Sequence, residues 1–334
     1  MMMDDKTVRS GIDVIIPTYH PDERFRELIR RLYAQSVPPD RIFIVNTDYS
    51  LFNDELIENR EKVNVFHIEK EAFDHAATRS MAVRMTKAPY FVMMTQDALP
   101  ANRHLLEELI KGFEREADPE APTAVVYARQ LAAKNASEEE KYGRRFSYPP
   151  AGRTKSKKDL EELGIMTYTC SDVCAAYNRS IFTTLGGFEE PAIFNEDMVY
   201  AAKAVNSGYA VRYEAEAKVI HSHRLTPLKQ LHRNFDLGVS QADHPEVFES
   251  VPSEGTGMKL VSGTIGHLLK KGKLLEIPWF MTGAVFRYAG YRLGKNYRRL
   301  PRRMVRALSA SPGYWDKTCD GKKGKERYGK GSER

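Results

Sequence analysis

The stretch YFVMMTQDALP, residues 90–100, joins an apolar run of strand length to a polar loop that carries a carboxylate. Similar apolar runs occur at residues 12–16 (IDVII), 42–45 (IFIV), 63–68 (VNVFHI) and 124–127 (AVVY). Amphipathic stretches with helical spacing lie between them at 22–35, 75–85 and 105–113. Apolar strands that alternate with helices are typical of a mostly parallel sheet covered by helices. The sequence therefore predicts an α/β fold.

Ligands of such sheets bind beyond the carboxyl ends of the strands, so the residues that follow each run are candidate site residues. These are Thr18 and Tyr19, the triplet NTD at 46–48, and Gln96 with Asp97. A carboxylate in the position of Asp97 could hold a hard divalent cation through oxygen. It could equally be a turn or N-cap aspartate before the helix that we expect from residue 102.

Two adjacent carboxylates, Glu196 and Asp197, stand at the start of a predicted helix, with Asn195 before them. Acidic residues near a helix N-terminus often only complement the helix dipole. The alternative is a general base for a hydroxyl nucleophile, which Asn195 could help to orient.

Further candidates are the pair His221 and His223, which follows a short apolar run, and Arg79 on the helix at 75–85. One histidine could join Asp97 at a metal while the other packs, although a lone histidine is more often structural. Arg79 suits a diphosphate, because a guanidinium makes bidentate contacts with phosphate oxygens, but on an exposed helix it would only be solvated.

Several function classes lose support because their signatures are missing. The chain has no Walker loop, no G-x-G-x-x-G, no G-x-S-x-G and no H-E-x-x-H.

The three cysteines favour a reducing compartment, and Cys170 and Cys174 are interpreted as small buried residues rather than metal ligands. The opening residues MMMDDKTVRS carry no secretory pattern, and the apolar stretch 277–286 is too short to span a bilayer. We expect a cytoplasmic protein.

The 334 residues carry a net charge of +6, which is unevenly distributed. Residues 258–330 contain eighteen Lys and Arg against four Asp and Glu, or +14; the last four residues are neutral, so residues 1–257 carry 6 − 14 = −8. Basic and aromatic residues interleave at near-helical spacing in residues 258–310, which favours a helical extension lying on an anionic membrane. The alternative is a helical subdomain that packs on the preceding domain or on a second copy. Nucleic-acid binding is disfavoured because no recognition module is present.

The sequence thus predicts three regions: an α/β domain with the candidate site residues at 1–245, a basic membrane-associating extension at 246–312 and a disordered tail at 313–334. Within the first region, residues 134–158 turn polar without a clear period. They are interpreted as a long surface excursion, either an acceptor loop or a solvated insertion.

A set of motifs in order along residues 11–245 resembles the inverting family 2 glycosyltransferases with the GT-A fold, and within them the rhamnosyltransferase branch. The motifs are VIIPTYH (14–20), IFIVNTD (42–48), FDHAATRS (73–80), TQDALP (95–100), C-S-x-V-C-A-A-Y (170–177), LGGFEEPAIFNEDM (185–198), HSHR (221–224) and R-x-F-D-x-G (233–238). Their common order and spacing, rather than any single motif, carries the resemblance.

The resemblance implies roles for individual residues. Nucleotide-sugar contacts are implied for Pro17, Thr18, Tyr19, Thr47, Asp48, His75, Arg79 and Gln96. Asp48 would read the base, with Thr47 as the alternative, and Arg79 would face the diphosphate. Asp97 would hold a magnesium or manganese ion together with His223 or His221, of which His223 is favoured. Asp197 matches the catalytic base, with Glu196 beside it.

The activity implied is transfer of a sugar, L-rhamnose from dTDP-L-rhamnose, to a hydroxyl of a lipid-linked cell-surface polysaccharide with inversion at the anomeric carbon. Its partners would be the donor, the glycan acceptor, the inner face of the cell membrane and a second copy in a homodimer. Two alternatives remain open: a UDP-hexose donor, and a non-catalytic membrane-bound scaffold of the same fold.

Overall fold

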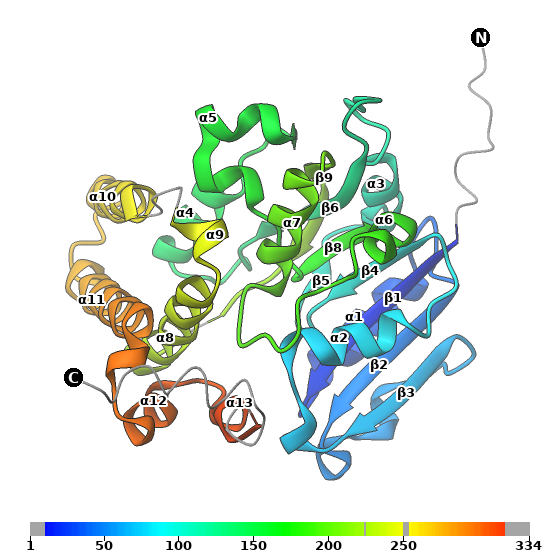
Figure 1. Ribbon diagram of the computed structural model, residues 1–334, viewed down its shortest axis with the longest axis horizontal. Coiled ribbons are helices and arrows are strands. Elements are labelled where there is room, and N and C mark those ends of the chain that lie inside the picture. The colour runs from blue at the N-terminus through cyan, green and yellow to red at the C-terminus, as the bar shows by residue number, and fades with distance from the viewer. Residues whose placement is uncertain (1–10, 224, 250–253, 318–334) are drawn as a thin grey trace. The chain divides into compact units, whose positions relative to one another are not determined.

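The structure is a computed structural model that describes residues 11–223, 225–249 and 254–317 (Figure 1). The chain divides into two compact units. The first holds residues 11–69, 77–189 and 197–222, and the second holds residues 70–76, 190–196 and the described residues from 223 onward. The division after residue 222 lies upstream of the domain boundary that the sequence suggested at 245.

The first unit is built on one nine-stranded sheet with the order β3-β2-β1-β4-β8-β6-β9-β5, in which β7 also pairs with β9. The strands are β1 (Ile12–Tyr19), β2 (Arg41–Thr47), β3 (Val63–Ile68), β4 (Tyr90–Met94), β5 (Leu99–Pro100), β6 (Thr123–Leu131), β7 (Arg153–Lys155), β8 (Cys174–Asn178) and β9 (Ala210–Ile220). The pairings of β1 with β2 and β4, of β2 with β3 and of β6 with β9 are parallel. Strands β5, β7 and β8 run antiparallel to their neighbours. The sheet is therefore mostly parallel, as predicted.

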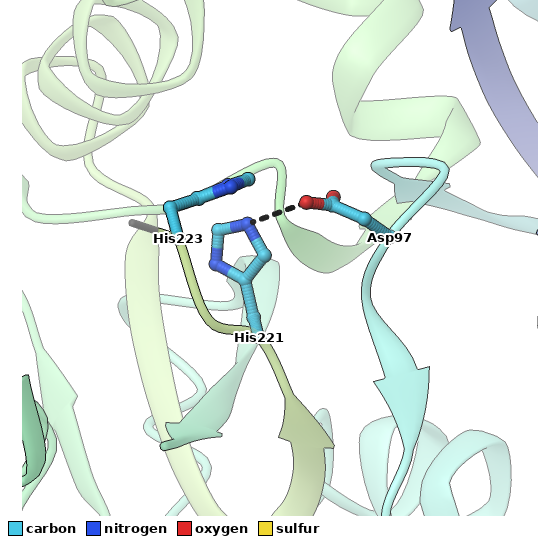
Figure 2. Close-up of side chains that lie close together, drawn as sticks. All are labelled: Asp97, His221 and His223. Atoms are coloured by element: carbon cyan, nitrogen blue, oxygen red, sulfur yellow. Dashed lines mark ion pairs between the residues drawn. The ribbon is translucent and has the colours of Figure 1, made fainter. Parts of the chain in front are cut away.

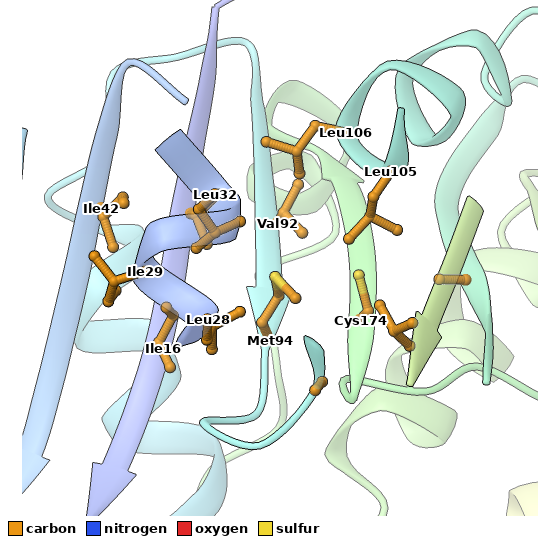
Figure 3. Packing of buried hydrophobic residues seen from close by; sticks show 14 of the residues in the cluster. Ile16, Leu28, Ile29, Leu32, Ile42, Val92, Met94, Leu105, Leu106 and Cys174 are labelled. Carbon is orange, nitrogen blue, oxygen red and sulfur yellow. The ribbon is translucent and has the colours of Figure 1, made fainter. Parts of the chain in front are cut away.

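Helices cover both faces of this sheet. The helices of this part of the chain are α1 (Glu23–Tyr33), α2 (His75–Val83), α3 (Leu105–Lys111), α4 (Glu138–Ser147), α5 (Leu160–Leu163), α6 (Arg179–Thr184) and α7 (Glu196–Asn206). On one face, Leu28 and Leu32 of α1 and Leu105 of α3 pack on the strands (Figure 3). On the other face, the rings of Tyr177 and Phe182 pack edge to face at 5.6 Å between centroids. Both faces are thus buried, which explains the nearly continuous apolar runs of the strands.

Residues 134–158 differ from the predicted surface excursion, because they contain helix α4 and strand β7. The Ser137 side chain caps α4 by accepting a hydrogen bond from the Glu140 amide. Three glutamates in the first turn and two arginines in the last also match the helix dipole. Cys170 and Cys174 are buried, as expected of small core residues.

The second unit is helical. Its helices are α8 (Pro227–Asp243), α9 (Pro245–Phe248), α10 (Glu254–Lys270), α11 (Glu276–Lys295), α12 (Arg302–Leu308) and α13 (Pro312–Lys317). Phe235 and Val239 of α8 share a buried cluster with Tyr297 and with Trp315 of α13. Residues 313–317, which the sequence assigned to a disordered tail, therefore belong to a packed helix. The rest of that predicted tail, including Cys319, lies outside the described residues. No described helix is both long enough and apolar enough to cross a bilayer.

Candidate active site

The carboxyl ends of β1 and β2 form a polar edge that holds the first group of predicted residues. Thr18 donates a hydrogen bond to the Asn46 side chain at 3.0 Å, and Asn46 donates to the carbonyl of Asp48 at 2.9 Å. Thr47 is buried. The Asp48 carboxylate accepts from the Ser50 amide and hydroxyl at 3.1 and 2.6 Å, and its backbone has a positive φ of 69°. Asp48 thus shapes the loop that follows β2.

Gln96 joins this edge to the end of β4. Its side chain accepts a hydrogen bond from the Tyr19 amide at 2.8 Å and donates to the Tyr19 carbonyl at 3.1 Å. Tyr19 is 48% exposed, and Pro17, two residues earlier, is half-buried. Sequence reasoning missed a second exposed aromatic here, Tyr49, whose ring packs on His67 at 4.8 Å. The two exposed rings are suited to stacking on a planar base.

Asp97 and His221, which are 124 positions apart in the sequence, lie next to each other. The Asp97 Oδ2 and His221 Nε2 atoms are 3.5 Å apart (Figure 2). His223 follows two residues along the same segment, and one ligand atom of each of the three residues lies within 4.8 Å of the others. One carboxylate and two imidazoles in this arrangement can hold a divalent cation.

His221 is 5% exposed and is oriented by neighbours that sequence reasoning missed. Its Nδ1 lies 3.0 Å from Gln130 Oε1 and 3.2 Å from Arg144 Nη2. With a proton on Nδ1 donated to Gln130, the ring presents an unprotonated Nε2 toward Asp97, which is the form that a metal requires. Arg144, which also donates a hydrogen bond to Gln130, belongs to α4, so residues 134–158 supply part of the site.

Asp197 lies in the first turn of α7, half-buried, directly after Asn195 and Glu196. Its Oδ2 accepts a hydrogen bond from the Asp172 amide at 2.9 Å, and its Oδ1 accepts from the Met198 amide at 2.7 Å. Asn195 has a positive φ of 63°, a conformation that asparagine tolerates better than most residues. Two amides therefore orient the carboxylate that matches the catalytic base.

Arg79 is buried beside Asp172 and does not lie on an exposed helix face. It is 6% exposed, and its Nε is 3.2 Å from Asp172 Oδ2. The other oxygen of Asp172 accepts a hydrogen bond from the Tyr177 hydroxyl at 2.6 Å. Burial raises the pKa of Tyr177 well above its ordinary value, and the charge of Asp172 adds to this, so the phenol stays a donor. Asp172 was missed because it occupies the variable position of the C-S-x-V-C-A-A-Y motif.

The loop before β8 connects the two halves of the site. Gln130, which orients His221, donates a hydrogen bond to the Ser171 hydroxyl at 2.9 Å, and the next residue is Asp172. Tyr148, at the end of α4, also lies here: burial raises its pKa, the Arg144 charge and a hydrogen bond with Ser171 lower it in part, and the Asp197 charge acts in the raising direction. The cation-binding cluster and the candidate base are thus linked within one unit by residues 171 and 172.

His75 and Glu196 belong to the other unit, where His75 Nδ1 lies 3.9 Å from Glu196 Oε1. Glu196 is 6% exposed. The structure therefore pairs these two predicted residues with each other.

A mostly parallel α/β unit with a candidate base and a carboxylate–histidine cluster beyond its strands defines a class, the GT-A glycosyltransferases. A sequence model of the family described as Glycosyl transferase family 2 matches residues 13–186. The chain belongs to this family and is a glycosyltransferase.

Similar proteins agree with this assignment. The chain is 34% identical over 307 residues to the O-antigen chain rhamnosyltransferase RfbN of Salmonella typhimurium, covering 91% of this chain and 96% of the relative. It is also 34% identical to the O-antigen chain rhamnosyltransferase WbaN of Salmonella anatum, covering 91% and 95%. Among solved structures, the mannosyltransferase PcManGT of Pyrobaculum calidifontis, in complex with GDP-Man and Mn²⁺, shares the fold with a TM-score of 0.54. The identity is 17%, and the match covers 85% of this chain and 86% of that one.

Proposed function

We propose that the chain transfers L-rhamnose from dTDP-L-rhamnose to a hydroxyl of a lipid-linked cell-surface glycan, with inversion at the anomeric carbon. The two relatives are both named O-antigen chain rhamnosyltransferases, which supports rhamnose as the sugar and a cell-surface polysaccharide as the product. The observation that carries the proposal is the link, through residues 171 and 172, between Asp197 and the cluster of Asp97 and His221.

In this mechanism Asp197 is the general base. Its carboxylate, oriented by the amides of Asp172 and Met198, takes the proton from the acceptor hydroxyl. The hydroxyl oxygen then attacks the anomeric carbon on the face opposite the leaving nucleoside diphosphate. One carboxylate suffices, because the diphosphate leaves without needing a proton, unlike the leaving group in glycoside hydrolysis.

Asp97, which follows β4, and the two histidines that follow β9 fit a divalent cation, which would supply positive charge for the departing diphosphate. Asp97, His221 and His223 offer one oxygen and two nitrogens. Magnesium prefers an all-oxygen shell, whereas manganese also accepts imidazole, so we propose Mn²⁺ rather than Mg²⁺. Calorimetry of dTDP binding should show tighter binding with Mn²⁺ than with Mg²⁺. The His221→Ala variant should lose that difference, and equal affinities in the wild type would contradict the assignment.

A donor screen tests the function. The full-length protein is incubated with dTDP-L-rhamnose and with UDP-hexoses, and release of the nucleoside diphosphate is measured with and without lipid-linked glycan. We expect release from dTDP-L-rhamnose that the glycan stimulates. The Asp197→Asn variant should lose transfer by about a thousandfold while it still binds dTDP. Preference for a UDP-hexose would overturn the donor, and no release from any donor would favour the scaffold alternative.

We further propose that the helices α10 and α11 lie on the anionic inner face of the cell membrane. Leu275, Trp279, Val285 and Tyr288 are 95%, 62%, 59% and 59% exposed. Residues 258–330 carry a charge of +14, which complements anionic lipid headgroups. Self-association through the same residues is the alternative, and light scattering without lipid would detect it as a dimer.

A further inference from the structure

The second unit contains a pocket of about 460 Å³ whose lining is rich in basic side chains. Lys229, His232 and Arg233 lie at positions i, i+3 and i+4 of α8 and therefore share one face of that helix. His75 adds a fourth basic group from α2. Of the residues assigned above to the nucleotide sugar or to the cation, His75 lines this pocket and the others do not.

One acidic residue, Asp236, also lines the pocket, one turn further along α8. Its carboxylate is 1% exposed and accepts a hydrogen bond from the Ala310 amide at 2.9 Å. Burial raises its pKa to about 7, so it carries only part of a negative charge near neutral pH. Lys229 and Arg233 are the permanent cations of the lining, and Glu196 pairs with His75 beside them.

Packing and hydrogen bonds hold the basic side chains of the pocket in place. The Arg233 guanidinium lies over the Phe194 ring at 5.0 Å from its centroid, and the rings of Phe194 and His75 pack at 6.5 Å. The Ser240 hydroxyl, on the same helix, donates a hydrogen bond to the Phe194 carbonyl at 2.8 Å. Phe194 belongs to the segment that leads through Asn195 and Glu196 to the proposed base.

We propose that this pocket binds a phosphate group of the acceptor, the phosphate ester or diphosphate that joins a glycan to its lipid. This rests on the proposed function. Arginine and lysine make strong charge-assisted hydrogen bonds with phosphate oxygens, and two imidazoles add donors when protonated. A neutral glycan would not call for such a concentration of cations. No lining residue of the pocket belongs to the cluster of Asp97, His221 and His223 that is proposed for the donor's diphosphate.

The test measures binding to the full-length protein by calorimetry, with geranyl diphosphate, inorganic pyrophosphate and dTDP as probes. The variants are Lys229→Gln, the double variant Lys229→Gln/Arg233→Gln, and Lys87→Gln as the matched control at an exposed position before β4. We expect the double variant to bind geranyl diphosphate at least tenfold more weakly, and Lys229→Gln about threefold more weakly. Lys87→Gln should bind as the wild type does. Lys229 is exposed, so its single variant tests the site even if the double variant folds poorly.

The probes separate the sources of the phosphate. Tighter binding of geranyl diphosphate than of pyrophosphate supports a lipid-borne group, and equal binding that still depends on Lys229 supports a phosphate site without lipid selectivity. Unchanged binding in both variants overturns the proposal, as does a parallel loss of dTDP affinity, because the pocket would then belong to the donor. Donor hydrolysis by the wild type tests the proposed function separately, since it does not require the acceptor.

Discussion

Asp172 makes three contacts that give a single side chain influence over the candidate base. Its carboxylate pairs with Arg79 and accepts from Tyr177, and its amide donates to Asp197. Asp172 is 3% exposed, and its contacts with Arg79 and Tyr177 compensate for lost hydration. Arg79 therefore has a structural task, whatever it contributes to the donor.

The Arg79→Gln variant tests this task. Removing one member of a buried ion pair strands the other, so we expect the free energy of unfolding to fall by about 3 kcal/mol in urea titrations. Arg84→Gln, at an exposed position of the following turn, should change it by less than about 0.5 kcal/mol. If Arg79→Gln instead weakens dTDP binding and leaves stability unchanged, Arg79 acts on the diphosphate and not through Asp172.

Asp236 predicts a particular dependence of stability on pH. Its pKa is raised from 3.8 to about 7 in the folded state by burial, so between these values the folded protein holds a proton that the unfolded chain has lost. The contribution of Asp236 to the free energy of unfolding therefore falls as the pH rises from about 4 to about 7. Between about pH 5 and about pH 7 this loss amounts to about 2 to 3 kcal/mol. The Asp236→Asn variant should lose this slope in denaturant titrations, whereas Asp54→Asn, at an exposed site, should keep it. An identical slope in Asp236→Asn would contradict the assignment.

At the residue scale, the sequence was informative where the chemistry is rare. Asp97 was a candidate site residue because it is a carboxylate that follows an apolar run, and His221 because it begins an H-x-H that follows another. The structure places these two side chains next to each other. Gln130 and Asp172 could not be singled out, because common polar residues acquire a role only through contacts with distant residues. Their partners lie up to 93 positions away, as between Asp172 and Arg79.

At the scale of the element, α8 and α11 cross at a distance that only glycine permits. A β-carbon added at Gly290 would overlap the Leu231 carbonyl oxygen, and one at Gly294 would overlap that of Phe235. Because the obstacle is backbone, a rotamer change cannot relieve it. The glycines therefore hold the helix that carries Lys229 and Arg233 against α11.

The Gly294→Ala variant should accordingly be destabilised by about 1 to 3 kcal/mol, as expected of overpacking, and its melting temperature should fall. The matched control is Gly266→Ala on α10, where an added β-carbon meets nothing within 4 Å. That change should stabilise the protein by about 0.5 to 1 kcal/mol, because alanine favours the helix. A similar response of both variants would mean that the crossing does not constrain the helices.

Elements were predicted as far as their own periodicity extended. The apolar runs at 12–16 and 90–95 became β1 and β4, because strands buried on both faces leave a local pattern. The α4 helix was missed because it has no fully buried residue, so no apolar stripe marks it. Its cap at Ser137 was the available signal. The packing of Trp315 could not be predicted for a different reason. The basic composition of the C-terminal segment does not indicate that Trp315 packs against residues of α8.

At the scale of the whole molecule, charge and apolar exposure coincide in the C-terminal helices. The +14 of residues 258–330 stands against −8 for residues 1–257, and Trp279 is 62% exposed on α11. An exposed tryptophan among cations is expected at a membrane interface, where the ring enters the headgroup region and the cations meet anionic lipids. Neither feature alone would distinguish a membrane from a protein partner.

The two tryptophans of the chain make this surface measurable, because Trp315 is 1% exposed and Trp279 is not. With phosphatidylglycerol vesicles, the fluorescence of the wild type should shift to the blue as Trp279 leaves water. The Trp279→Phe variant, which retains only the buried Trp315, should show no shift while it still sediments with the vesicles. Raising the salt from about 0.1 M to about 0.5 M should weaken binding, and phosphatidylcholine vesicles should bind poorly. A shift that persists in Trp279→Phe, or that ignores lipid charge, would contradict the membrane surface and favour contact with a second copy of the chain.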